Sequence, residues 1–373
     1  MSPIRSLWIC CLLAPLAAGA TSLQVETIAS GLEHPWALVF LDNDRMLISE
    51  RAGRLRLVAD GQLLEAPIAG VPASFARAQG GLQDLALHPR FAENGWIYLS
   101  LAHGSASENS TRVVRGRIRG QAWVDSEIVF TATPSKDTPV HYGARMAFLP
   151  DETLLISVGD GFDYREHAQK LDSHLGKIVR VTDRGEVPVD NPLLHRQTAL
   201  PEIFSYGHRN VQGIVVDGDN GRIWTHEHGP RGGDELNLIR PGANFGWPVA
   251  TAGVDYSGAR VSPYATRAGM VDPLLVWTPS IAPAGLALYQ GDLFADWRGD
   301  LLITSLAERS LRRVRLQGER VVEQQIVPLD LDRRLRDVEV GPDGALYLLT
   351  DHADGEVLRV TPGLTQPVGG SAW

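Results

Sequence analysis

The feature of this sequence that most constrains its fold is an apolar strand–turn–strand pattern that recurs six times. In each copy, two short apolar runs flank a turn or loop that contains Asp, Asn, Gly or Pro. Such pairs of runs are typical of β-hairpins. The six pairs span residues 37–41 and 46–49, 82–87 and 96–100, 145–149 and 153–157, 213–216 and 222–225, 285–289 and 300–304, and 337–340 and 345–349.

Several copies continue into a third run in which apolar and polar residues alternate, at 55–58, 178–181, 311–316 and 357–360. Six units within about 350 residues give a period of roughly 60 residues, which suits a four-stranded blade. A pair of β-sandwiches would also alternate, but it would not explain the sixfold return of one pattern. We therefore predict an all-β fold, a six-bladed β-propeller of four-stranded antiparallel blades around a central channel. The longest helical candidate, around 166–174, is short and polar.

The first twenty residues have the features of a signal peptide. Arg5 is their only charged residue, residues 7–18 are apolar, and Ala18-Gly19-Ala20 has the small-x-small form of a cleavage site. A membrane anchor is the alternative, but the apolar run is shorter than the roughly 20 residues that span a bilayer. We expect cleavage after Ala20, which leaves residues 21–373 as one propeller domain.

The composition restricts the cellular compartment and the classes of function that are expected for this chain. Both cysteines, Cys10 and Cys11, lie in the predicted signal peptide, so the mature chain would have neither disulfides nor cysteine chemistry. We expect a soluble periplasmic or secreted protein, without stable membrane insertion. The net charge is −9 and no run of Lys or Arg forms a basic face, which argues against nucleic acid as a partner. No nucleophile elbow, P-loop or dinucleotide-binding fingerprint is present.

Polar residues stand just before, or at the start of, several of the repeated units. A propeller gathers the entrances of its innermost strands at one end of the channel, so these side chains should converge there. A base, an acid, an amide and several guanidinium groups in one concavity would suit an anionic, polar ligand. The residues are Gln79, His141, Arg145, Arg209, Asn210, Arg334 and Arg336, with Asp160 at the far end of the third hairpin.

The segment 226–235 has the densest run of polar residues and glycines in the chain. His226 and His228 are two residues apart and would share one face of a strand, so a zinc site is one interpretation. The stretch from Gly229 to Gly233 contains Pro230 and cannot continue as a regular strand. Its exposed carbonyl groups would suit a hard cation such as calcium. A conformationally demanding loop between blades is the third interpretation.

At these residues the sequence resembles the soluble aldose sugar dehydrogenases that depend on pyrroloquinoline quinone (PQQ), a family of six-bladed propellers that includes the glucose and sorbosone dehydrogenases. The resemblance covers about residues 32–362. Each motif is weak alone, but seven of them occur in order at propeller spacing. They are His34-Pro35-Trp36-Ala37, Gln79-Gly80-Gly81-Leu82, His141-Tyr142-Gly143-Ala144-Arg145, Tyr206-Gly207-His208-Arg209-Asn210, Glu227-His228-Gly229-Pro230, Asn244-Phe245-Gly246-Trp247-Pro248 and Arg334-Leu335-Arg336-Asp337.

The resemblance implies three catalytic residues, His141, Asp160 and Arg209, and a substrate-binding amide at Gln79. His141 matches the general base that takes the proton of the anomeric hydroxyl while hydride passes to PQQ. Asp160 matches the acid that orients this histidine and faces the substrate. Gln79 matches a substrate-side amide, and Arg209 matches a group that stabilises negative charge on the reduced quinone.

The resemblance also implies how PQQ and calcium would be held. Arg209 and Asn210 match residues that hydrogen-bond the quinone oxygens. Arg334 and Arg336 match arginines that bind the cofactor, which is a tricarboxylate. The backbone carbonyls of Gly229 and Pro230 match calcium ligands, and the ion would act as a Lewis acid on the quinone.

One position departs from the family pattern. The family often has a lysine that contacts PQQ after the second strand of the fifth blade, and Ala307 stands at that place here. Either Arg309 substitutes for the lysine, or PQQ is held by fewer charges.

The function expected from this resemblance is oxidation of an aldose to its lactone. Without a haem-attachment motif, the electrons would pass to a separate acceptor. Two alternatives use the same architecture: a calcium-dependent lactonase or esterase, and a non-catalytic propeller that binds a partner. The arginine pair Arg334 and Arg336 argues against the first, because a neutral lactone does not need two guanidinium groups. His141, Arg145 and Asp160 argue against the second.

Overall fold

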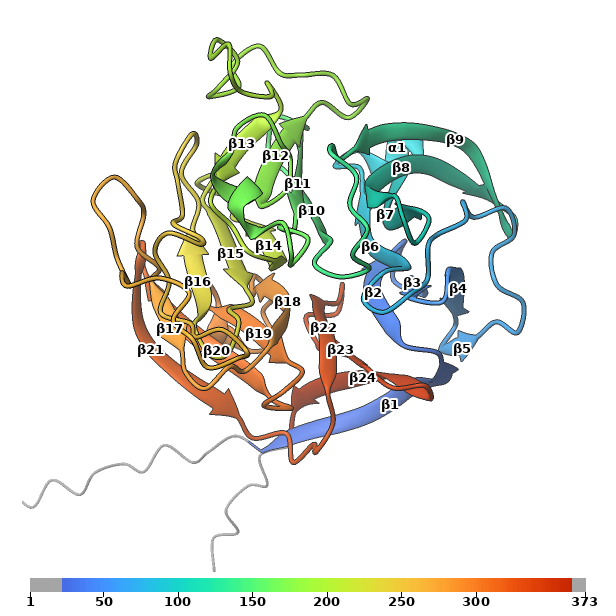
Figure 1. Cartoon of the computed structure of the whole chain (residues 1–373). Helices are drawn as coiled ribbons and strands as arrows, with labels where there is room; N and C mark the ends of the chain where they lie inside the picture. Colours follow the sequence, from blue (N-terminus) through green and yellow to red (C-terminus); the bar gives the residue numbers. More distant parts are fainter. Residues whose placement is uncertain (1–21, 364–373) are drawn as a thin grey trace, which may run out of the picture.

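The computed structural model describes residues 22–363, so the predicted signal peptide lies outside the described residues. The chain forms six four-stranded antiparallel sheets arranged around a central axis (Figure 1). This architecture confirms the predicted six-bladed β-propeller. The first strands of neighbouring sheets contact each other in a ring, and they form the wall of the central channel.

Each of the six predicted hairpins forms the first two strands of one blade. Blade 1 contains β2 (Pro35–Phe40), β3 (Arg45–Glu50), β4 (Arg54–Ala59) and β5 (Gln62–Leu63). Blade 2 contains β6 (Leu82–Leu87), β7 (Ile97–Gly104), β8 (Asn109–Arg119) and β9 (Ala122–Thr131). Blade 3 contains β10 (Gly143–Phe148), β11 (Leu154–Val158), β12 (Lys177–Val181) and β13 (Ile203–Tyr206).

The second half of the chain repeats this arrangement. Blade 4 contains β14 (Val211–Val216), β15 (Ile223–Glu227), β16 (Asp234–Leu238) and β17 (Leu275–Trp277). Blade 5 contains β18 (Pro283–Leu288), β19 (Leu301–Ser305), β20 (Leu311–Gln317) and β21 (Arg320–Val327). Blade 6 contains β22 (Leu335–Val340), β23 (Leu346–Thr350) and β24 (Gly355–Pro362).

The fourth strand of blade 6 comes from the other end of the domain. Strand β1 (Leu23–Leu32) runs antiparallel to β24, with Leu23 opposite Pro362 and Leu32 opposite Gly355. Figure 1 shows the two strands side by side at the rim, one in blue and the other in red. The ring is therefore closed by hydrogen bonds between strands from the two ends of the described chain. The repeated sequence pattern contained no sign of this pairing.

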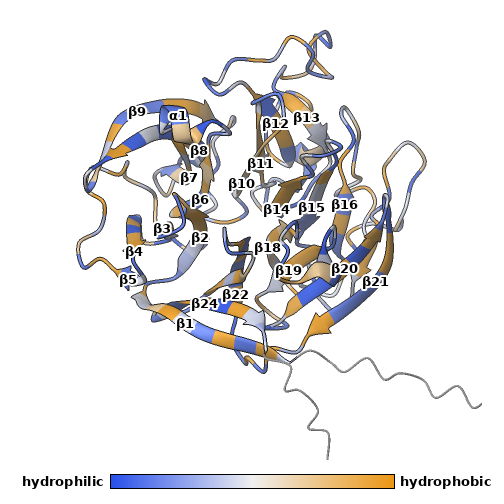
Figure 2. Cartoon of the chain, turned by 180° about the vertical axis from the view of Figure 1, so that it is seen from behind, coloured by the Kyte–Doolittle hydropathy of each residue, from blue (hydrophilic) through white to orange (hydrophobic). Residues whose placement is uncertain are grey.

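The core lies between the blades, which explains why the inner strands are apolar on both faces. In β3, Leu47 packs in the cluster between blades 1 and 2, whereas Met46 and Ile48 pack between blades 1 and 6. Alternate residues of one strand thus serve two interfaces. The outermost strand β21 is mostly exposed, and Figure 2 shows hydrophilic residues interspersed with hydrophobic ones along it.

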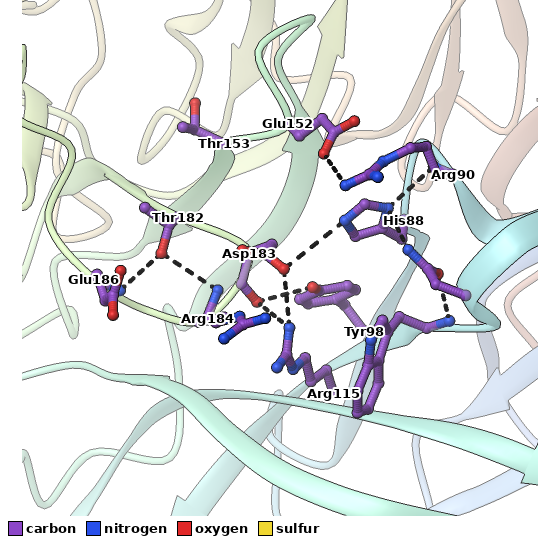
Figure 3. Close-up of polar contacts among 12 residues, drawn as sticks. His88, Arg90, Tyr98, Arg115, Glu152, Thr153, Thr182, Asp183, Arg184 and Glu186 are labelled. Carbon is purple, nitrogen blue, oxygen red and sulfur yellow. Dashed lines mark hydrogen bonds and ion pairs between the residues drawn. The ribbon is translucent and has the colours of Figure 1, made fainter.

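A polar network supplements the apolar contacts between blades 2 and 3 (Figure 3). The Arg115 guanidinium donates to the backbone and side-chain oxygens of Asp183 at 3.0 and 3.1 Å. The Tyr98 hydroxyl donates to the same backbone oxygen at 2.8 Å, and the His88 imidazole lies beside the Asp183 carboxylate at 3.9 Å. These contacts tie the loop after β12 to blade 2.

Helical structure is sparse in residues 22–363. The candidate around 166–174 is a short 3₁₀ segment, η1 (Arg165–Gln169), and the other turns of helix are α1 (Phe91–Asn94) and η2 (Ala295–Trp297). None of the helices described has the length and apolar character needed to cross a membrane.

Candidate active site

Two adjoining pockets lie where the chain enters and leaves the inner strands. The central pocket, with a volume of about 250 Å³, is lined in part by Gln79, Asn210, Arg334 and Arg336. The side pocket, of about 290 Å³, is lined in part by His141, Arg209 and Pro230. Arg209 and Asn210 are consecutive, and the Gln79 side-chain oxygen accepts the His141 backbone N–H at 2.8 Å, so the pockets share a wall. The fold thus gathers residues that the sequence analysis selected from four separate units.

His141 and Asp160 form a buried pair at the inner end of the side pocket. The imidazole Nδ1 lies 2.7 Å from Oδ1 of Asp160, whose side chain has no exposure to solvent. Asp160 also accepts hydrogen bonds from the Phe162 backbone N–H at 2.8 Å and from the Trp247 indole Nε1 at 2.7 Å. Since a carboxylate only accepts, Nδ1 of His141 carries the ring proton and Nε2 is the basic nitrogen.

The electrostatic environment of His141 favours its neutral form. Burial lowers the pKa of His141, and the hydrogen bond and charge of Asp160 partly oppose this effect. The nearby cations Arg209 and Lys136 lower the pKa further. Within residues 22–363, Nε2 of His141 has no hydrogen-bond partner. The ring is therefore set up to accept a proton from a group in the side pocket.

Glycine at position 159 lets these two residues meet. A Cβ on Gly159 would lie 2.2 Å from the backbone oxygen of His141, so any side chain there would displace His141. His141 itself has a left-handed backbone conformation with φ of 52°, which is strained for a non-glycine residue. The hydrogen bond from its N–H to Gln79 helps to hold this conformation.

Arg209 links the side pocket to the glycine-rich loop of blade 4. Its Nη1 donates to the backbone oxygens of His228 at 3.1 Å and Gly229 at 2.7 Å. Its backbone N–H donates to the Glu227 carboxylate at 2.5 Å. The guanidinium carbon lies 5.3 Å from the centre of the Trp247 ring. Arg209 is thus held between the loop and the aromatic wall of the pocket.

The loop at Gly229 and Pro230 offers carbonyl oxygens and no free carboxylate. Asp234 turns inward, where it accepts the Gly229 backbone N–H at 2.8 Å and the Ser280 hydroxyl at 2.6 Å. Hard carbonyl oxygens fit calcium as part of a larger ligand set, to which a bound cofactor would contribute. Among the described residues, no group of three or more His, Cys, Asp or Glu side chains is placed to hold a metal.

The two histidines of the same segment do not share a ligand site. The Nε2 of His226 lies 3.2 Å from the Gly285 backbone oxygen, and the Nε2 of His228 lies 2.8 Å from that of Pro283. Both rings therefore connect blade 4 to blade 5 through hydrogen bonds to β18. The zinc interpretation gains no third ligand from the part of the chain that the structure describes.

The central pocket contains a cluster of charges that the sequence analysis found only in part. Arg334 and Arg336 each place Nη2 near Oδ2 of Asp351, at 3.0 and 3.1 Å, and His34 contacts Oδ1 at 3.1 Å. Although burial alone would raise the pKa of Asp351, Arg336, His34 and Arg334 together hold it well below its ordinary value. Asp351 was missed, although it follows the second strand of blade 6 as Asp160 follows that of blade 3.

Two buried polar atoms in this pocket have no partner among residues 22–363. They are Nε of Arg336 and Oε1 of Gln83. Nε of Arg336 is a buried donor whose missing partner costs free energy, which a ligand that accepts hydrogen bonds would recover, whereas Oε1 of Gln83 is an acceptor and needs a donor. The donors and charges present therefore fit a cofactor with several carboxylates.

Arg145, a sequence candidate, lines neither pocket. Its side chain points into the channel, where Nη1 lies 2.9 Å from Asp84 and Nη2 lies 3.0 Å from Asp337. The guanidinium also covers the ring of Trp36 at 4.1 Å. Arg145 lies at the third residue of β10, where the alternation of the strand directs it to the axis. It therefore joins inner strands from several blades and has a structural role.

Two exposed aromatic residues flank the mouth of the side pocket, and the sequence analysis missed both. Phe162 is 42% exposed and Tyr256 is 58% exposed, and their rings lie 6.1 Å apart at an angle of 25°. The Phe162 ring meets His141 edge-on at 5.2 Å. Phe162 has φ of 68°, a strained conformation for a bulky residue that aims its ring at the pocket mouth.

Arg309 lies away from both pockets. Its guanidinium forms an exposed ion pair with Asp332 at 2.7 Å, in a separate depression of the surface. Leu306 lines the central pocket, but Ala307 does not. Arg309 is therefore not placed to replace the lysine that the family resemblance led us to look for near Ala307.

Comparisons with known proteins identify the family to which this chain is similar. Residues 32–359 match the family model described as glucose/sorbosone dehydrogenase. The aldose sugar dehydrogenase YliI of Escherichia coli (strain K12) is 41% identical over 358 residues, which cover 94% of this chain and 96% of that protein.

Solved structures show the same similarity. The apo form of the soluble aldose sugar dehydrogenase from Escherichia coli superposes with a TM-score of 0.88 at 40% identity, over 92% of this chain and 100% of that one. The PQQ-bound aldose sugar dehydrogenase from Streptomyces coelicolor superposes with a TM-score of 0.74 at 29% identity, over 91% of this chain and 99% of that one.

Proposed function

The chain belongs to the glucose/sorbosone dehydrogenase family, and from this premise we propose that it oxidises aldose sugars at the anomeric carbon to lactones with PQQ as cofactor. The observation that carries the proposal is the junction of two pockets. A buried His–Asp pair lies in one, and guanidinium groups with an unpaired donor lie in the other. An oxidation that removes a proton and a hydride from one C1–OH group needs both features side by side.

His141 acts as the general base of this reaction. Its Nε2 takes the proton of the anomeric hydroxyl, and the C1–O bond becomes the carbonyl of the lactone as hydride leaves C1. PQQ, when bound, would supply the acceptor for that hydride, and calcium would supply a Lewis acid. Asp160 stabilises the imidazolium that forms and keeps its ring in the orientation set by the 2.7 Å hydrogen bond.

The central pocket holds the cofactor. Arg334 and Arg336 bind its carboxylates, with Asp351 keeping both side chains in place. Asn210 and Arg209 hydrogen-bond its quinone oxygens from the wall shared with the side pocket. The carbonyls of Gly229 and Pro230 hold the calcium ion.

The side pocket holds the sugar. Gln79 lines the central pocket at the wall shared with the side pocket, and because its oxygen accepts the His141 N–H, its amide N–H groups are left for a sugar hydroxyl at this wall. Phe162 and Tyr256 offer aromatic faces, on which the apolar C–H face of a pyranose packs. Asp160 lies behind the wall of the side pocket, and it acts on the sugar through His141, which it orients.

The cellular location of the proposed reaction depends on the expected export of the protein. We propose that the mature protein works in the periplasm or outside the cell after cleavage near Ala20. Its partners are then an aldose and a separate electron acceptor, with neither nucleic acid nor stable membrane insertion involved.

The test uses purified protein, PQQ, calcium, an aldose and an electron-accepting dye. Dye reduction that requires sugar, PQQ and calcium together supports the proposal, and omission of each component in turn is the control. Absence of both PQQ binding and dye reduction contradicts it. In that case, hydrolysis of lactones with calcium alone decides whether the protein is a lactonase.

A further inference from the structure

Arg51 is an arginine of the central pocket to which neither the sequence motifs nor the proposed mechanism gives a role. It follows directly after β3 in blade 1, the place that Asp160 and Asp351 occupy near the ends of the second strands of blades 3 and 6. Its side chain lines the pocket together with Arg334 and Arg336. Within residues 22–363, its guanidinium forms no hydrogen bond and no ion pair.

The charges of the pocket are unbalanced because of Arg51. Arg334 and Arg336 share one carboxylate, that of Asp351, which is the only acidic side chain in the described lining. Three guanidinium groups therefore face one carboxylate, which leaves an excess of two positive charges in a half-enclosed space. Such an excess is stable when a ligand brings at least two negative charges into the pocket.

The backbone around Arg51 holds the base of this side chain in place. The Arg51 N–H donates to the His34 oxygen at 3.1 Å, and the Arg51 oxygen accepts the Leu82 N–H at 3.3 Å. Gly81 makes this close approach possible, because a Cβ there would lie 1.9 Å from the Arg51 oxygen. Gly81 has φ of 132°, which other residues rarely adopt. Arg51 is therefore anchored between blades 1 and 2, unlike a solvent-exposed surface arginine.

We propose that Arg51 binds a carboxylate of the cofactor, as a third guanidinium beside Arg334 and Arg336. Arg51 supplies from blade 1 a positive charge that a lysine at position 307 would supply from blade 5, where this chain has Ala307. Arg309 cannot do so, because its ion pair with Asp332 lies in a different depression. This inference rests on the proposed function, since it takes PQQ as the ligand of the central pocket.

The experiment measures binding of PQQ to the full-length mature protein with calcium present, by quenching of tryptophan fluorescence, without any sugar. We expect R51Q to raise the dissociation constant about 10- to 100-fold, the range for loss of a hydrogen bond between charged groups. R51K, which keeps the charge but loses the planar fork, should have an intermediate value. R309Q is the matched control and should bind as the wild type does, whereas R334A should bind more weakly.

A second ligand separates a direct contact from a general disturbance. The trimethyl ester of PQQ lacks the three carboxylate charges, so R51Q and wild type should bind it with equal affinity. Unequal affinity for the ester, or equal affinity for PQQ itself, would overturn the role of Arg51. Thermal unfolding of R51Q checks that the variant is folded, and if it is not, the same comparisons are made with R51K.

The outcomes also separate this inference from the proposed function. If the wild type does not bind PQQ, the proposed function fails and the inference fails with it. If the wild type and R51Q bind PQQ equally well, only the inference about Arg51 fails.

Discussion

The Nδ1 atom of His141 lies 2.7 Å from the carboxylate of Asp160, and the two residues stand at the two open ends of a single hairpin, β10–β11. The hairpin belongs to blade 3, and the indole of Trp247, beyond blade 4's third strand, contacts the other carboxylate oxygen. The His141 ring is thus oriented by a residue of its own blade and, through Asp160, by a neighbouring loop. This arrangement leads to three predictions about the rate and its dependence on pH.

Replacing His141 by Gln should lower kcat about 10²- to 10⁴-fold, the usual effect of losing a general base. PQQ binding should stay nearly intact, because the imidazole lies in the side pocket. The two quantities are measured by dye reduction and by fluorescence titration. His195→Gln, at an exposed histidine, is the control. Unchanged turnover in H141Q would remove His141 from the mechanism.

Replacing Asp160 by Asn should shift the acid limb of the kcat/KM profile to lower pH. The negative charge of Asp160 raises the pKa of His141 against the effect of burial, so its loss lowers that pKa further. The neutral base then persists to lower pH, while kcat falls because the imidazolium is less stabilised. An acid limb that stays in place or moves to higher pH would contradict this role.

Replacing Trp247 by Phe should shift the same limb in the opposite direction. The variant keeps the aromatic ring but loses the N–H that donates to Asp160 at 2.7 Å. The carboxylate then attracts the proton on His141 more strongly, so the pKa of His141 rises. We expect kcat to fall about tenfold for the lost hydrogen bond. Trp277→Phe, which removes an indole bond to Gln324, is the control, and an identical pH profile in both variants would exclude a positioning role.

Replacing Phe162 or Tyr256 by Ala should raise KM for aldoses, by about tenfold for each lost aromatic contact. kcat should change less, since neither residue touches the proton that is transferred. Steady-state kinetics with several aldoses measures both constants. Tyr264→Ala removes a comparably exposed tyrosine outside the pocket lining and should leave KM unchanged. A fall in kcat at constant KM would argue against a sugar-binding surface.

Replacing Arg145 by Met should destabilise the fold by about 3–5 kcal/mol, because it leaves buried carboxylates unpaired. Asp84 is the sensitive partner, since burial already raises its pKa to about 6. A raised pKa in the folded state favours folding at low pH, so the loss should be smaller at pH 5 than at pH 8. Urea unfolding at both pH values tests this, with the exposed Arg119→Met as control. A loss that is equal at both pH values would mean that the carboxylates are not responsible.

The sequence predicted those parts of the fold that local pattern determines. Each hairpin is encoded by neighbouring residues, and six copies of it imply a ring. The ring in turn brought Gln79, His141, Asn210 and Arg334 to one end, as expected from their places before the inner strands.

The features that the sequence did not predict depend on the direction in which a side chain points or on contacts between residues far apart in the chain. Arg145 was expected at the mouth, but the alternation of β10 turns it to the axis. Asp351 and Arg51 follow the second strands of their blades, as Asp160 does in blade 3. The positional argument that selected Asp160 therefore also applies to these two residues. Phe162 depends on a strained loop conformation, for which the sequence offers no periodic signal.

The pairing of β1 with β24 also determines when the protein can finish folding. Among residues 22–363, β1 is the first strand to be synthesised and its partner β24 is the last, so β1 has no place in a sheet until β24 is available. Contacts between residues so far apart in the chain are slow to form. An incomplete chain therefore remains an open arc with an unsatisfied strand at each end.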